Sequence, residues 1–99
     1  MTMTATPLTE SVLLDALRQV IDPEIGMNIV DLGLIYNLDI AGGTVRVAMT
    51  ATTPGCPLQD TLTGGVQMAL LNLAGVNDVH VQMVWDPPWT PAMINPAAL

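Results

Sequence analysis

The chain of 99 residues contains one cysteine, Cys56, which is its most distinctive candidate for chemistry. Cys56 lies in residues 50–57, between a strand-like run and a helix-like run. Pro57 suits the first position of a helix, because its fixed φ is already helical and its missing N–H has no intrahelical partner there. Cys56 is then expected at the N-cap, where free N–H groups and the helix dipole stabilise a thiolate. A thiolate attacks electrophiles and binds metals, so the position predicts a functional thiol, and the alternative is a buried, inert cysteine.

Three carboxylates, a hydroxyl and an indole are the other candidates for a site around this thiol. Asp22 and Glu24 flank a proline, where they either form a turn or contribute to the site. Asp31 stands among apolar residues at the start of a predicted strand, which makes simple solvation a weaker explanation for it. Thr52 is expected to support the cysteine loop by hydrogen bonding. Trp89, within a proline-rich segment, is either a plug of the core or an aromatic docking residue.

Catalysis by a cysteine nucleophile normally requires a base held near the thiol. The one histidine of the chain, His80, is predicted on a different strand, alternating with apolar residues and exposed to solvent. We therefore expect neither a small cysteine enzyme nor a histidine metal ligand.

Composition excludes several classes of function. The net charge is −7 with two basic residues, so the chain cannot displace counterions from nucleic acid. No apolar run approaches the roughly 18–20 residues of a membrane span. Residues 1–6 lack a basic and apolar leader pattern, and a single cysteine fits a reducing compartment, so we expect a cytoplasmic protein. Few charged residues and many apolar ones favour self-association, and we expect a homodimer.

The spacing of apolar residues defines the elements. Helical periodicity alternates with period-two runs, and glycine and proline mark the turns between them. The predicted elements are a helix over residues 8–21, a strand over 31–40, a strand over 44–52, a helix over 58–73 and a strand over 78–86. We expect one domain over residues 6–93, with flexible termini at 1–5 and 94–99.

This order predicts an α+β fold, a two-layer sandwich with two helices on one face of a small mixed three-stranded sheet. Gly42 and Gly43 are expected to close an antiparallel hairpin, and the strand–helix–strand unit around Cys56 should be a parallel crossover. The last strand should place Trp85 inward under a helix. Trp89, Asp31 and Cys56 are then expected to line one shallow site at the same edge of the sheet.

Four motifs occur together and in order: DPEIG at residues 22–26, NIVDLGL at 28–34, TATTPGCP at 50–57 and WDPPWTP at 85–91. In this the chain resembles the metal–sulfur cluster biosynthesis family, the SufT-like and PaaD-like proteins formerly described as a domain of unknown function. The resemblance extends from about residue 12 to residue 93. The positions that match the family motifs are Asp22, Pro23, Glu24, Asp31, Thr52, Cys56, Pro57, Trp89 and Pro91.

The resemblance implies a cytosolic, non-catalytic factor that helps to mature client iron–sulfur proteins, with the assembly machinery and client apoproteins as partners. PaaD-like proteins carry an additional cysteine-rich region, so this chain looks closer to the short SufT-like form. Cys56 is the implied ligand of a transient or bridging cluster, with Asp22, Glu24, Asp31, Thr52, Pro57 and Trp89 in support. The alternatives are a non-catalytic interaction module with a structural cysteine, and an accessory protein of a multicomponent oxygenase.

Overall fold

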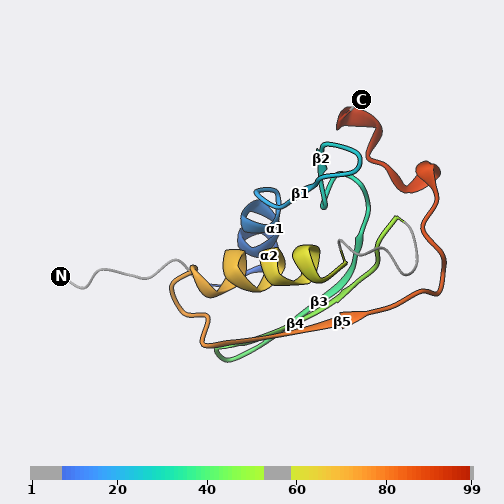
Figure 1. The fold of residues 1–99 in the computed structure, drawn as a ribbon. Coiled ribbons are helices and arrows are strands. Elements are labelled where there is room, and N and C mark those ends of the chain that lie inside the picture. The colour runs from blue at the N-terminus through green and yellow to red at the C-terminus, as the bar shows by residue number, and fades with distance from the viewer. Residues whose placement is uncertain (1–7, 53–58, 99) are drawn as a thin grey trace.

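A computed structural model describes residues 8–52 and 59–98 of the chain. Within these residues two α-helices accompany a three-stranded main sheet, and Figure 1 shows the helices on one side of that sheet. The elements are α1 (Glu10–Leu17), β1 (Ile21–Asp22), β2 (Met27–Asn28), β3 (Ile35–Ala41), β4 (Thr44–Met49), α2 (Gln59–Leu71), β5 (Asp78–Met83) and the 3-10 turns η1 (Pro91–Met93) and η2 (Pro96–Ala98). This is the predicted α+β arrangement, with a small β1–β2 hairpin in addition.

The main sheet has the strand order β3-β4-β5. β3 pairs antiparallel with β4, and β4 pairs parallel with β5, as the sequence predicts. Gly42 takes a φ of 61° in the two-residue turn between β3 and β4, a conformation that glycine adopts without steric cost. Val45, Val47 and Met49 alternate along β4 and are buried, so one face of the sheet forms the floor of the core.

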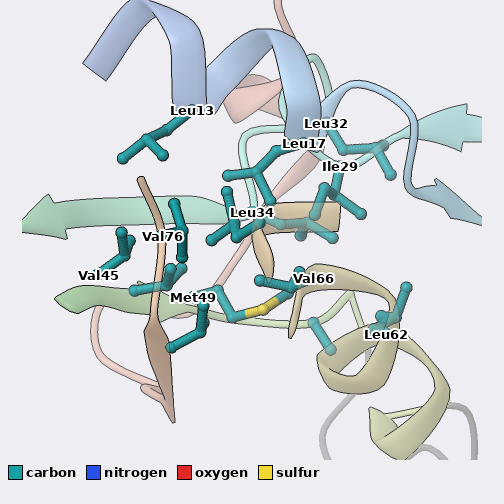
Figure 2. Close-up of a cluster of buried hydrophobic side chains, with 14 residues drawn as sticks. Leu13, Leu17, Ile29, Leu32, Leu34, Val45, Met49, Leu62, Val66 and Val76 are labelled. Carbon is teal, nitrogen blue, oxygen red and sulfur yellow. The ribbon is translucent and has the colours of Figure 1, made fainter. Parts of the chain in front are cut away.

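The core lies between this face and the two helices, as Figure 2 shows. α1 contributes Leu13 and Leu17, and α2 contributes Leu62, Val66 and Leu70. Each such aliphatic side chain stabilises the fold by about 1.5–3 kcal/mol when fully buried. Gly65 lets α2 approach the segment after α1 closely, because a Cβ at this position would lie 3.2 Å from Cγ1 of Val20.

The first helix is shorter than predicted, because it covers Glu10–Leu17 and not residues 8–21. Thr9 is the N-cap, and its hydroxyl accepts a hydrogen bond from the Val12 N–H at 3.2 Å. After the helix, Ile21–Asp22 pairs with Met27–Asn28 in a short hairpin. The apolar spacing continues to Ile21, but this side chain is 50% exposed, since pairing in the hairpin replaces the last helical turn.

The first main strand also begins later than predicted, at Ile35 and not at residue 31. Leu32 and Leu34 are buried as the alternation predicts, but Leu32 lies in a turn and Leu34 directly after it, outside the strand. Gly33 has a φ of 81°, which no extended strand accommodates. α2 is described from Gln59 and ends at Leu71, and β5 ends at Met83, each short of the predicted limit.

Candidate functional site

Asp31 lies in the turn before β3, where it is held by the side chain of Asn28. The Asn28 amide donates to Oδ2 of Asp31 at 2.7 Å, and the Asp31 N–H donates to Oδ1 of Asn28 at 2.9 Å. The hydrogen bond from Asn28 lowers the pKa of the Asp31 carboxyl below its ordinary value, and Asn95 and Arg18 act in the same direction against partial desolvation. Asp31 is therefore a fixed negative charge at neutral pH.

A C-terminal strap, residues 86–95, packs against this turn. The Trp89 indole N–H donates to the carbonyl of Leu32 at 2.6 Å. The Asn95 N–H donates to the carbonyl of Asp31 at 2.7 Å. Figure 1 shows the strap, in orange to red, turning from the end of β5 toward the β1–β2 hairpin. The strap thus joins the last part of the described chain to the turn that carries Asp31.

The Tyr36 hydroxyl adds a third anchor, because it donates to the carbonyl of Pro87 at 2.7 Å. Partial burial raises the pKa of the Tyr36 phenol, and the Asp86 carboxylate adds to this rise. The phenol therefore stays protonated and available as a donor. Gly33 permits the close packing of the strap, since a Cβ there would clash with the carbonyl oxygen of Met93.

The prediction that Trp85 is buried under a helix is wrong. Trp85 is 38% exposed and does not pack under a helix. The reason is that β5 ends at Met83, opposite the last residue of β4, so that residue 85 lies beyond the paired sheet. Trp89 packs partly against the core and donates its indole hydrogen bond there. Of the two roles left open for Trp89, contact with the core is the one observed.

The C-terminal end of β4 reaches the same end of the sheet. The Thr50 N–H donates to the carbonyl of Leu34 at 2.9 Å, which places this end beside the Asp31 turn. Thr50 is fully buried, and its hydroxyl has no hydrogen-bond partner within the part of the chain described. Thr52 follows in a bend and is partly buried.

Cys56 and Pro57 lie outside the described residues, so the N-cap position of the thiol stays a prediction. Asp31, Trp89 and the exit of β4 are brought to one end of the sheet, as the predicted topology requires. The expectation that Cys56 completes this group also stays a prediction.

Asp22 and Glu24 occupy the β1–β2 hairpin. Asp22 is only 2% exposed, and its Oδ1 accepts a hydrogen bond from the Glu24 N–H at 2.8 Å. This is the turn chemistry that the sequence suggests for the pair. Glu24 itself is exposed. A role of either carboxylate in the site stays a prediction.

Sequence reasoning missed two amide side chains, those of Asn28 and Asn95, which orient the Asp31 carboxylate. Asn28 and Asp31 are three residues apart, a spacing at which an amide side chain bonds a nearby backbone N–H, and this signal was available. Asn95 acts across 64 residues of sequence, for which no local signal exists.

Within residues 8–52 and 59–98, no three His, Cys, Asp or Glu side chains are grouped closely enough to hold a metal ion. The described helices also include none with the length and apolar character needed to cross a membrane.

The family is decided by the match of residues 10–83 to the sequence model of the iron–sulfur cluster assembly protein family. The chain belongs to this family. It is also 46% identical over 79 residues to the Fe-S protein maturation auxiliary factor YitW of Bacillus subtilis, which covers 79% of this chain and 78% of that one. The match to the family model includes three of the four motifs, those at residues 22–26, 28–34 and 50–57.

A solved structure and a longer protein extend these similarities. A conserved hypothetical protein from Thermotoga maritima has a TM-score of 0.84 and 40% identity, covering 96% of this chain and 94% of that one. An iron-sulfur cluster carrier protein from Synechocystis is 38% identical over 81 residues, which make up 82% of this chain and 23% of the carrier. The same domain therefore occurs alone and as part of a larger carrier.

Proposed function

We propose that this chain is a cytoplasmic, non-catalytic factor that assembles or delivers iron–sulfur clusters to client apoproteins, with Cys56 as its functional thiol. The cluster is cargo in this proposal. The observation that carries it is the 46% identity, over most of both chains, to a maturation auxiliary factor. The similarity to a cluster carrier points in the same direction.

The geometry around the cysteine loop supports this role. The chain after β4 is buried up to Ala51, and α2 is already helical at Gln59. Residues 53–58, which include Cys56, therefore connect two packed parts of the fold. A thiol before the first turn of α2 gains thiolate character from the helix N-terminus. The ionised Asp31 and the acidic Asp60 in the first turn of α2 oppose it. The balance of these charges sets how readily the thiol binds and releases iron.

One thiolate cannot complete the ligand set of an iron–sulfur cluster, which usually takes four protein thiolates. Three arrangements satisfy this limit: a cluster shared across a homodimer, a transient complex with the ligands of a client, or a thiol that contacts a partner protein. All three require an accessible Cys56.

Replacement of Cys56 by serine tests the proposal in cells that lack the wild-type protein. The specific activities of several unrelated iron–sulfur enzymes should fall together, while the amounts of their polypeptides stay constant. Asn72→Ala, a change at an exposed residue in the turn after α2, is the control and should behave as wild type. Full activity with Cys56→Ser would favour the interaction module instead, and a loss confined to one oxygenase would favour an accessory protein of that enzyme.

Two measurements on the purified protein address the thiol directly. Alkylation across pH should give an apparent pKa of Cys56 below the ordinary ~8.5. A value at or above this, or labelling only after unfolding, would contradict the functional thiol. Anaerobic purification with iron and sulfide assays then distinguishes stable loading with a cluster from transient transfer.

A further inference from the structure

The strand β5 forms one border of the sheet and has backbone groups without a strand partner on its outer side. The N–H groups of Asp78 and Val84 donate to carbonyls at the two ends of β4, Gly43 and Met49. Successive residues of a strand direct their backbone groups to opposite sides, so Val79, Val81 and Met83 direct theirs away from β4. No described strand pairs with this side, where the Asp78 carboxylate accepts from the Val79 N–H at 3.0 Å.

The opposite border, β3, carries features that disfavour pairing with another strand. Ala41 and Thr44 close the hairpin, so Leu38 and Ile40 direct their backbone groups outward. The register shifts between Ile35 and Asn37, which bends the strand. Asp39 is exposed at the centre of the outward-facing stretch. Two copies of β3 centred there would bring Asp39 against itself, and like charges directly opposite are destabilising.

β5 has no register shift, and its one carboxylate, Asp78, lies at its first residue and not at its centre. Its register with β4 runs without a shift from Asp78 to Met83. Residues 79–85 contain no carboxylate, lysine or proline, although the chain as a whole carries a net charge of −7. Exposed His80 and Gln82 alternate with apolar residues, and the half-exposed Trp85 follows at the end of the stretch. This is an unprotected edge of the kind that accepts a further strand.

We propose that β5 pairs antiparallel with β5 of a second copy, about a twofold axis at Val81, to form a continuous six-stranded sheet. The two Val81 residues exchange a pair of N–H···O bonds at the axis. His80 then lies opposite Gln82 across the axis, and Asp78 lies opposite Val84, so that no carboxylates meet. This identifies the interface of the homodimer expected from the composition.

The proposed dimer has a consequence for cargo, and this consequence rests on the proposed function. β4 is parallel to β5, and the two β5 strands are antiparallel. The C-terminal ends of the two β4 strands therefore point in opposite directions. The dimer favours one cargo site per subunit over a cluster bridged between two.

Proline substitution at each edge tests the interface with the cluster-free protein in sedimentation velocity at micromolar to sub-millimolar concentration. Neither the Val81 N–H nor the Leu38 N–H is used inside the sheet, so Val81→Pro and Leu38→Pro are matched changes that the fold can accommodate. Val81→Pro removes both symmetry-related donors and should raise the dimer dissociation constant at least about tenfold. Leu38→Pro should leave it unchanged. A wild-type monomer throughout, or equal effects of the two variants, would overturn the proposal.

Amide hydrogen exchange in the wild type provides a test that does not depend on a variant folding. Protection of the Val81 and Met83 amides should rise with protein concentration, while the Leu38 amide should exchange at a constant rate. Concentration-dependent protection of Leu38 and not of Val81 would refute the interface. Cys56→Ser should dimerise normally, so failure of the interface and failure of cluster delivery are separate results.

Discussion

Replacement of Trp89 tests how the C-terminal strap is held. Trp89→Phe keeps an aromatic ring and removes the N–H that donates to the carbonyl of Leu32, a fully buried residue. Loss of this hydrogen bond, which leaves the Leu32 carbonyl without the indole donor, should lower the free energy of unfolding by about 1–2 kcal/mol. Trp89→Ala also removes packing and should cost about 2–4 kcal/mol, less than for a fully buried tryptophan. Trp85→Ala should cost under about 1 kcal/mol, because this side chain is 38% exposed.

Urea denaturation followed by circular dichroism measures these differences in the free energy of unfolding. In a domain of this size, each 1 kcal/mol corresponds to a melting-temperature change of about 4–8 °C. A larger loss for Trp85→Ala than for Trp89→Ala would refute the assignment of the two side chains. Wild-type stability of Trp89→Phe would show that the indole hydrogen bond is not stabilising. Because Trp89→Phe is the milder change, it is also the better probe of a role for the ring in client maturation.

Three further predictions concern the same end of the molecule. The pKa of Asp31 is lower in the folded state, so its carboxylate stabilises the fold above the unfolded-state pKa of about 4. Asp31→Asn should therefore have a lower free energy of unfolding than wild type at neutral pH. In acid titrations this difference should disappear as the pH falls below about 4 and through the folded-state pKa of Asp31. Gly33→Ala should lower the free energy of unfolding by more than about 2 kcal/mol, and Gly42→Ala, with positive φ but open space, by about 1 kcal/mol; equal losses would rule out the contact with Met93. Thr50→Val should raise the free energy of unfolding by about 1 kcal/mol, since it removes a buried hydroxyl that has no hydrogen-bond partner among the described residues. A lower free energy of unfolding would instead show that the hydroxyl has a hydrogen-bond partner.

Local patterns predicted the order of α1, β3, β4, α2 and β5 and the hairpin of β3 with β4. Alternation along residues 44–51 identifies the buried face of β4, and paired glycines locate the turn before it. These signals succeed because each depends on neighbouring residues alone. The early end of α1 was not predicted, because the hairpin of Ile21–Asp22 with Met27–Asn28 depends on pairing across a turn. The late start of β3 was not predicted, because apolar alternation does not reveal the positive φ of Gly33.

The candidate site was predicted in part. The parallel crossover correctly placed the strap and the Asp31 turn at one end of the sheet. Trp85 was assigned to the interior by extending the parity of β5 two residues past its end, and parity carries no information once pairing stops at Met83. The bond from Asn95 to Asp31 joins distant segments, and composition and periodicity are blind to such contacts.

The hydrogen bonds of the strap also determine when the molecule can become complete during synthesis. Tyr36 bonds Pro87, Leu32 accepts from Trp89 and Asp31 accepts from Asn95, across 51, 57 and 64 residues. β3 and β4 can pair soon after they leave the ribosome, whereas the Asp31 turn waits for partners made much later. Contacts of such long separation form slowly. A nascent chain should therefore form the β3–β4 hairpin first, and the Asp31 turn can be completed only after residue 95 has been made.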